Sequence, residues 1–212
     1  MYSVTLEAPG LAKALANALY FIPAASKIQV ALIEFAATYV MTAGTDSYVA
    51  GTDQVKTANS SGLEPEDFKT VLVTKKDLDA LEKAARAAKK GVVTLTVDGE
   101  VLTLETGEGE PVTASLAVNE RALALYDSIA QIVIETEFKR PAAIPGVSCI
   151  DPAKFSPFAK VKTDKTERMA DIYQTEGDKG PWLIKIGPTF KGLLMPINRD
   201  IHRSNVGPEG LW

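Results

Sequence analysis

The chain begins with a short alternation of polar and apolar positions, which then changes to an apolar residue at every third or fourth position. The alternation over residues 2–6 predicts a strand. The spacing that follows predicts a helix that ends at Pro23, because proline lacks the backbone donor that a helix requires; its apolar residues are Leu11, Leu15, Leu19 and Ile22. Three further stretches are rich in β-branched and aromatic residues, and we expect antiparallel strands at residues 28–37, 39–43 and 48–55.

After a polar stretch at residues 57–67, which predicts a loop, the same pattern starts again with a strand at residues 68–73. Thr74 is expected to cap a second helix, with Asp77 three residues later as in a capping box. This helix is expected to end at Gly91, and its apolar stripe consists of Leu78, Leu81, Ala85 and Ala88. The pair Asp98-Gly99 is a strong hairpin signal, and it connects the first two of three expected strands, at residues 92–97, 101–105 and 111–118.

Residues 120–134 fit the helical and the strand period in part, and the first half favours a helix. The proline-rich residues 139–146 predict a connector, and the pattern then appears a third time. We expect a strand at residues 147–150 and a helix capped by Asp151, with Pro152 at its first position and apolar anchors at Phe155, Phe158 and Val161. Pro157 lies inside this helix, which should therefore be short or kinked. Strands complete the unit at residues 170–174, 182–186 and 193–197.

The repetition of a strand, a helix and antiparallel strands is the main structural inference from this pattern. Each predicted helix has one apolar face, so we expect an α+β fold with helices on one face of antiparallel sheets. With 212 residues the chain is long enough for two small domains. We expect a full domain at residues 1–116, a shortened domain at 117–200 and an irregular tail at 201–212.

Composition and charge narrow the function classes. The chain is 46% apolar and 24% charged, as in ordinary globular proteins. No apolar run approaches the roughly 18 residues that span a bilayer, and the first ten residues do not resemble a signal peptide, so we expect a cytoplasmic protein. The net charge of −4 argues against a protein that binds nucleic acid over its whole surface, but it is compatible with a local basic face.

Candidate catalytic and metal-binding residues are few. The single cysteine, Cys149, can form no internal disulfide, and together with the only histidine, His202, it cannot build a structural zinc site. The chain has no phosphate-binding glycine loop and no nucleophile elbow. Asp46 and Asp53 flank a predicted strand and could hold a metal ion, but a turn-forming function is preferred for Asp46. The sequence therefore predicts a protein that is not an enzyme and has no cofactor.

Three segments carry a resemblance to a known family. The helix end Phe21-Ile22-Pro23, the strand and turn Thr42-Ala43-Gly44-Thr45-Asp46-Ser47-Tyr48, and the closing segment 190–197 (FKGLLMPI) are similar, in this order, to segments of the bacterial DNA polymerase III β sliding clamp. The resemblance covers residues 1–116 as one full clamp domain and 147–198 as the latter half of another. A bacterial clamp subunit has three full domains, so this chain is short for the family, which is compatible with a phage or mobile-element origin.

The resemblance implies a processivity factor of DNA replication that encircles duplex DNA, with its helices lining the channel and its subunits forming a homo-oligomeric ring. Two pseudo-domains per chain favour a trimer. Such a protein attracts phosphates without recognising bases, so its binding weakens as salt rises. The cations in matching positions are Lys75, Lys76, Lys83, Arg86, Lys89, Lys90, Lys154, Lys160, Lys162 and Lys165. A solvated amphipathic surface is the competing interpretation of these cations.

The resemblance also implies a pocket for peptides of the DNA polymerase and the clamp loader. The matching residues belong to the closing element, namely Leu194, Met195, Pro196 and Ile197. An edge strand whose apolar residues pack into the core is the competing interpretation. Because the second domain is truncated, a second hypothesis is a clamp-like protein that does not encircle DNA and acts as an inhibitor, a decoy or an assembly factor.

Overall fold

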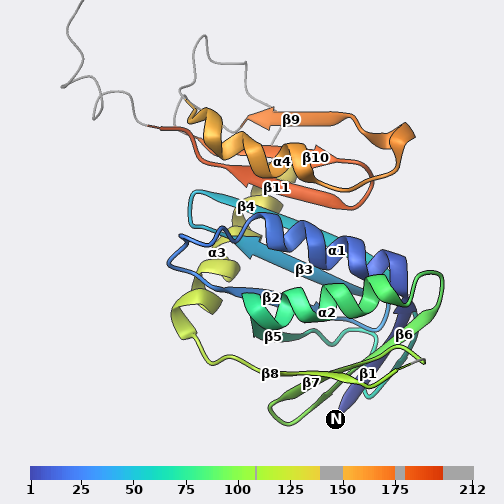
Figure 1. Ribbon diagram of the computed structural model, residues 1–212. Coiled ribbons are helices and arrows are strands. Elements are labelled where there is room, and N and C mark those ends of the chain that lie inside the picture. Colours follow the sequence, from blue (N-terminus) through green and yellow to red (C-terminus); the bar gives the residue numbers. More distant parts are fainter. Residues whose placement is uncertain (108, 139–149, 175–179, 198–212) are drawn as a thin grey trace, which may run out of the picture.

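The computed structural model describes residues 1–107, 109–138, 150–174 and 180–197, and its elements repeat one unit (Figure 1). The first unit consists of β1 (Tyr2–Glu7), α1 (Ala8–Tyr20), β2 (Val30–Phe35), β3 (Tyr39–Thr45) and β4 (Val49–Ser61). The second consists of β5 (Lys69–Thr74), α2 (Lys75–Ala87), β6 (Val92–Asp98), β7 (Val101–Glu105) and β8 (Val112–Ser115). The remaining elements are α3 (Glu120–Phe138), η1 (Pro152–Phe155), α4 (Ser156–Lys160), η2 (Lys165–Glu167), β9 (Ala170–Gln174), β10 (Trp182–Ile186) and β11 (Phe190–Leu194).

Strand β4 joins two antiparallel sheets. The first sheet has the order β5-β2-β3-β4-β11-β10-β9, and the second has the order β4-β1-β6-β7-β8. The first half of β4 pairs with β3 and β11, and its second half pairs with β1, with a register shift between Thr5 and Leu6. An irregularity of this kind bends a strand, which allows β4 to serve both sheets. The C-terminal strands are thereby attached to the first unit.

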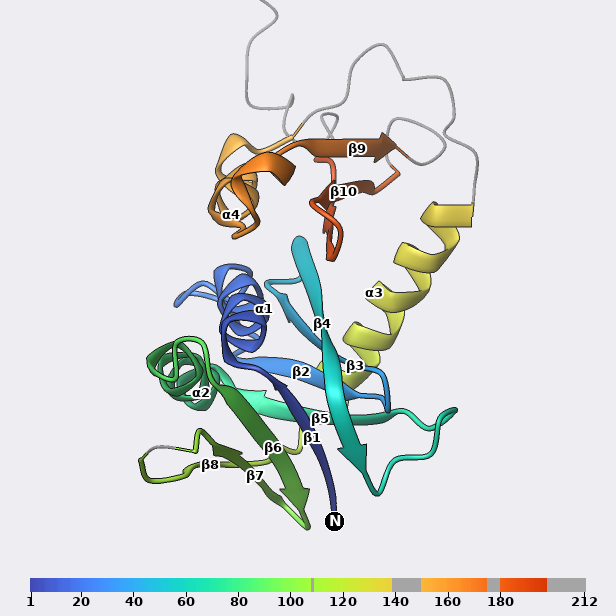
Figure 2. The ribbon, with the colours of Figure 1, turned by 90° about the vertical axis from the view of Figure 1, so that its right-hand side faces the viewer.

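The two faces of the first sheet are covered by different helices. Ala31, Ile33 and Phe35 of β2 belong to one buried cluster with the apolar residues of α1 and α2. The alternate residues Val30 and Leu32 belong to a second cluster with α3. Figure 2 shows α1 and α2 on one side of the β2–β3 sheet and α3 on the other. The predicted α+β fold is confirmed, and α3, helical over its whole length, is added on the face opposite α1 and α2.

Local signals explain several element boundaries. The Thr74 hydroxyl accepts the backbone N–H of Asp77 at 3.2 Å and donates to its carboxylate at 2.7 Å, which is the predicted start of α2. The β6–β7 hairpin turns at Gly99, whose φ of 56° suits glycine. Pro157 lies in the first turn of α4 and separates it from the 3₁₀ turn η1, so this helical segment is short, as expected.

Three boundaries differ from the predictions. Residues 57–61, expected in a loop, continue β4, because pairing with β1 satisfies their backbone despite their polar side chains. The closing strand was predicted at residues 193–197 but is β11, which ends before Pro196, a residue with no N–H for a ladder. Lys89, with φ of 53°, has the left-handed conformation after α2 that was expected at Gly91.

Some predictions fall on residues that the structure does not describe. These are the connector at residues 139–146, the strand at 147–150 apart from Ile150, the residues Cys149 and His202, and the tail at 201–212. Ile150 itself lies outside any strand. The division into domains at residues 1–116 and 117–200 stays a prediction. In the part of the chain that is described, no helix has both the length and the apolar character needed to cross a membrane.

Candidate nucleic-acid and peptide interfaces

Helices α1, α2 and α4 lie side by side on one face of the sheets (Figures 1 and 2). Asn17 of α1 is fully buried and ties the segment after α4 to α1. Its Nδ2 donates to the carbonyl oxygen of Lys162 at 3.2 Å, and its Oδ1 accepts the N–H of Lys162 at 2.8 Å. The three helices therefore form one continuous surface, which we call the helical face.

Six cations were predicted on the second helix; four of them lie on α2, whereas Lys89 and Lys90 follow its end at Ala87. All are exposed except Lys75, which is half-buried. Lys83 Nζ lies 2.6 Å from Asp79 Oδ2, and Arg86 Nη2 lies 3.3 Å from Glu82 Oε2. The other four form no ion pair with a described residue: Lys75, Lys76, Lys89 and Lys90. The Lys83–Asp79 pair is exposed and therefore weak, so Lys83 remains available to an anionic ligand, whereas Glu82, the partner of Arg86, is buried.

A groove of about 520 Å³ lies at the surface where α1 and α2 pack together. Lys162 reaches this groove from the segment after α4, with its Nζ 3.8 Å from Glu82 Oε1. Four cations and two acids line the groove, so its charge suits a phosphate; they are Lys75, Lys76, Arg86 and Lys162 with Asp79 and Glu82.

The other cations predicted in the third unit do not gather at the groove. Lys160 and Lys165 are exposed and form no ion pair with a described residue. Lys154 instead lies at the β3–β4 turn, with its Nζ 2.6 Å from Asp46 Oδ2 and 4.8 Å from the centre of the Tyr48 ring. The structure thus brings Lys162 to the cations of α2, whereas Lys154 belongs to a different surface.

The two aspartates considered as metal ligands have other partners. Asp46 Oδ1 accepts two backbone N–H groups of the β3–β4 turn at 2.9 Å, which is the turn-forming function expected for it. Asp53 is buried, and its Oδ2 accepts Nδ2 of Asn17 at 2.7 Å and lies 3.6 Å from Nζ of Lys13. Over the described ranges, no group of three histidine, cysteine or acidic residues could hold a metal ion.

The closing Met-Pro element lies beside the β3–β4 turn. Leu194 is buried in a cluster with Phe21 and Phe158, so its side chain packs into the core. Met195 is 38% exposed, and its N–H donates to the carbonyl oxygen of Tyr48 at 3.1 Å. Pro196 and Ile197, the other two predicted residues, are half-buried.

Tyr48, named from the sequence only as the end of the resembling segment, is brought beside the residues predicted for the peptide pocket. Tyr48 is 64% exposed and follows Ser47, whose φ of 79° is rare outside glycine. The Tyr48 ring is contacted on one side by the ammonium group of Lys154. A large aromatic residue directly after the Thr45-Asp46 turn was the available sequence signal, but its position beside Met195 depends on the β4–β11 pairing.

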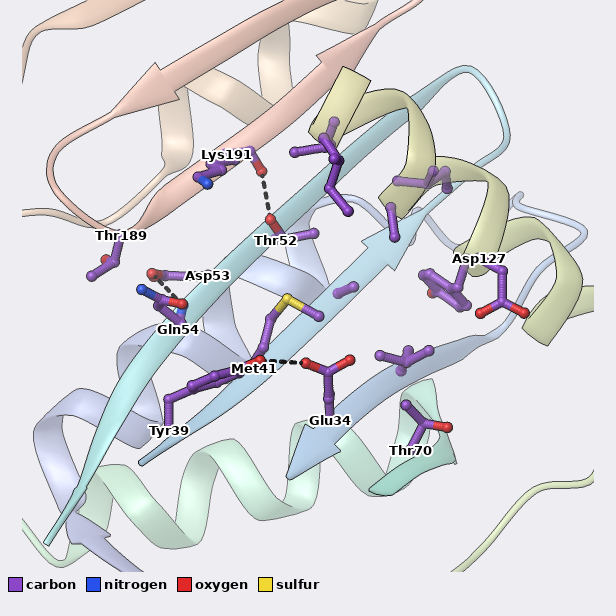
Figure 3. Close-up of a pocket in the computed structure, with 17 residues that line it drawn as sticks. Glu34, Tyr39, Met41, Thr52, Asp53, Gln54, Thr70, Asp127, Thr189 and Lys191 are labelled. Atoms are coloured by element: carbon purple, nitrogen blue, oxygen red, sulfur yellow. Dashed lines mark hydrogen bonds between the residues drawn. The ribbon is translucent and has the colours of Figure 1, made fainter. Parts of the chain in front are cut away.

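A second cavity, of about 340 Å³, lies between α3 and the sheet, on the face opposite α1 and α2 (Figure 3). Leu32, Met41 and Ala43 line it from the sheet, and α3 lines it with Ile129 and Val133. At its rim, the Tyr39 hydroxyl donates to Glu34 Oε1 at 2.8 Å. Burial, together with the hydrogen bond and charge of Glu34, raises the pKa of Tyr39 to about 12. Sequence reasoning named only Asp53 among the lining residues, as a possible metal ligand, and predicted no cavity here, because the cavity exists only once α3 has docked.

Comparison with known proteins finds similarity in structure but not in sequence. No protein-family model and no curated protein sequence matches the chain. Several solved structures do match, including the DNA polymerase sliding clamp of Bacillus subtilis, with a TM-score of 0.65 and 12% identity over 92% of this chain and 64% of that one. The clamp of Thermotoga maritima gives a TM-score of 0.65 and 9% identity, over 93% and 66% of the two chains. The Helicobacter pylori clamp bound to a DNA ligase peptide gives 0.64 and 12%, over 93% and 66%.

The chain therefore spans just under two thirds of the length of these clamps. The match extends over both repeated units and the C-terminal strands, since it includes more than nine tenths of this chain. The fold is that of the DNA polymerase III β sliding clamps.

Proposed function

We propose that the protein is a clamp-like DNA replication factor that binds duplex DNA without sequence preference through its helical face. The observation that supports this most directly is the group of cations on α2 and directly after it, five of which are exposed, beside α1 and α4. Residues 75–90 contain six cations and three acids, a net charge of +3, within a chain of net charge −4. All other residues together therefore carry −7, so positive charge is concentrated where DNA is expected.

The proposal is tested by measuring the affinity for a random-sequence duplex at several salt concentrations, by fluorescence anisotropy. We expect the affinity of the wild-type protein to fall steeply as salt rises. Lys76→Glu should weaken binding and reduce the slope of log affinity against log salt by about one, the effect of losing one phosphate contact. The matched control is Lys56→Glu, an exposed lysine on β4 with the same change of charge. No binding at low salt, or equal losses in both variants, would contradict the proposal.

We also propose that the turn at Tyr48 and the element Met195-Pro196 bind peptides of replication partners. The resemblance to the sliding clamps implies this function for the Met-Pro element. Tyr48 and Met195 are the exposed apolar side chains of this surface, and the backbone hydrogen bond between them fixes their separation. A panel of labelled peptides from bacterial DNA polymerases, clamp loaders and DNA ligase provides the test. Tyr48→Ala should lower peptide affinity about tenfold or more, as is common for an interface aromatic, and Lys76→Glu should leave it unchanged.

Sequence analysis raised two hypotheses, a clamp that encircles DNA and a clamp-like protein that does not. Ring closure distinguishes between them. A closed homo-oligomer in the cytoplasm, with a trimer favoured by two pseudo-domains per chain, would encircle DNA. A strict monomer would instead support the alternative of a non-encircling inhibitor, decoy or assembly factor. Light scattering over a range of protein and salt concentrations separates these outcomes.

A further inference from the structure

The cavity between α3 and the sheet is separate from both surfaces of the proposed function. Its volume is about 340 Å³, and it lies on the sheet face opposite α1 and α2 (Figure 3). Tyr48, Met195 and the cations of α2 are not among the described residues that line it. Small-molecule sites in proteins usually start at about 300 Å³. The cavity is therefore large enough for a small organic molecule, and neither proposed activity uses it.

Strand pairing gives the floor of the cavity two rows of side chains. Alternate residues of a strand lie on the same face of the sheet. One row, which is mainly apolar, runs across β2, β3 and β4 as Leu32, Ala43 and Thr52. The next row on the same face is more polar and consists of Glu34, Met41 and Gln54. Because α3 covers the floor with Ile129 and Val133, a bound molecule would contact apolar groups from the helix and the sheet.

Glu34 supplies a negative charge in the polar row. The residue is half-buried, and its Oε1 accepts the Tyr39 hydroxyl at 2.8 Å. Among the described residues, none donates a hydrogen bond to its Oε2 or forms an ion pair with it. A half-buried carboxylate is stabilised by a cationic partner, and a hydrogen bond between charged groups is about twice as strong as one between neutral groups. Glu34 is therefore suited to bind an ammonium group inside the cavity.

The other charges around the cavity also favour a cation over an anion. The charged lining residues are three acids and one lysine, a net charge of −2: Glu34, Asp53 and Asp127 against Lys191. Asp53 already accepts a hydrogen bond from Asn17 and lies 3.6 Å from Nζ of Lys13. Asp127 is exposed on α3 and, like Glu34, forms no ion pair with a described residue. A cation that enters beside Asp127 would meet negative charge on both the helix and the sheet.

We propose that this cavity binds a small amphipathic organic cation, that is, an apolar body that carries an ammonium group. The body lies between Leu32 and Met41 of the sheet and Ile129 of α3, and the ammonium group binds the Glu34 carboxylate. The proposal goes beyond the proposed function, because this site shares no residue with the DNA-binding and peptide-binding surfaces. A bound molecule contacts α3 and the sheet together, so it stabilises α3 on this face.

Binding is tested with phenylbutylamine, a cation at neutral pH, and with two probes that have the same apolar body, phenylbutanol and phenylbutyrate. NMR of protein labelled at the methionine methyl groups locates each probe, because Met41 lines the cavity whereas Met195 lies at the peptide-binding surface. We expect the amine to shift the Met41 signal and to leave the Met195 signal in place. Titration should give an affinity for the amine about tenfold above that for the alcohol, and the carboxylate should bind more weakly still.

Variants separate the effect of the charge from that of the cavity. Glu34→Gln should lower the affinity for phenylbutylamine about tenfold and leave that for phenylbutanol unchanged, because it removes the charge and keeps the size of the side chain. Ala130→Phe, at an exposed lining position of α3, should weaken the binding of all three probes by filling space. The matched control is Ala124→Phe, which is exposed on the same helix outside the cavity. Circular dichroism verifies that each variant keeps its fold.

Three results would overturn the proposal: a Met41 signal that phenylbutylamine does not shift, equal affinities for the three probes, or an unchanged affinity for the amine in Glu34→Gln. A shift of the Met195 signal in place of the Met41 signal would also overturn it, since the probe would then bind at the peptide surface. DNA and peptide binding are measured with other variants, Lys76→Glu and Tyr48→Ala, so failure of one proposal does not imply failure of the other.

Discussion

Replacing Asn17 by alanine should destabilise the protein strongly, because this side chain makes three hydrogen bonds inside the molecule. One joins Nδ2 to the Asp53 carboxylate at 2.7 Å, and two join the side chain to the backbone of Lys162 at 3.2 and 2.8 Å. A bond to a charged group contributes about 2 kcal/mol, and each bond to the backbone contributes about 1 kcal/mol. Asn17→Ala should therefore lower the free energy of unfolding by about 4 kcal/mol, a large part of the total for a domain.

Urea denaturation followed by circular dichroism measures this loss. The control is Asn59→Ala, at an exposed position of β4, where a change within about 0.5 kcal/mol is expected. Hydrogen exchange gives a second measurement. Asn17→Ala should accelerate the exchange of the amides of α4 and β11 more than that of the amides of β6 and β7, because the bonds to Lys162 hold the C-terminal unit on α1. A loss below about 1 kcal/mol, with uniform exchange rates, would refute the reasoning.

Three further predictions concern single positions. Gly44→Ala should lower the free energy of unfolding by about 3 kcal/mol, since its Cβ would collide with the backbone oxygen of Ala18, and a melting temperature close to that of the wild-type protein would contradict this. Thr74→Ala removes the cap of α2 and should cost about 1 kcal/mol in urea denaturation, whereas an unchanged midpoint would mean that the cap contributes nothing. The pKa of Tyr39, about 12 in the folded chain, lies above its ordinary value of 10.0, so its contribution to stability is complete below pH 10 and is lost as the pH rises towards 12. Tyr39→Phe should show a smaller alkaline loss of stability in denaturation at several pH values, and identical pH profiles would argue against it.

The elements that could be predicted from the sequence are those that depend on neighbouring residues. Thr74 and Asp77 define the start of α2, Gly99 permits the β6–β7 turn, and Pro157 interrupts the last helical segment; each acts within a few residues of itself. The second half of β4 was missed because its polar side chains indicate a loop, and only pairing with β1 makes it a strand. The position of α3 on the outer face was likewise beyond local patterns.

The residues of the candidate site also fall into those that nearby sequence predicts and those that depend on distant contacts. The cations at residues 75–90 could be identified from their number along one segment, and three of them, Lys75, Lys76 and Arg86, line the groove beside α1. Lys154 looked like another member of this group, but its ammonium group binds Asp46, a residue 108 positions earlier. The exposed position of Tyr48 beside Met195 also depends on a distant contact. Charge and spacing along the chain do not contain such information, because it arises when remote segments meet.

The position of β4 between β3 and β11 has a consequence for synthesis of the chain. The Thr52 hydroxyl donates to the carbonyl oxygen of Lys191, a contact that spans 139 residues. Ribosomes add about 5–20 residues per second, so β11 emerges roughly 7 to 28 seconds after the strand that it joins. During that interval the first unit can fold, but one edge of β4 has no partner and is open to pairing with other nascent chains. Chaperone dependence and aggregation during expression should therefore be governed by the delay before β11 arrives, more than by the stability of the finished protein.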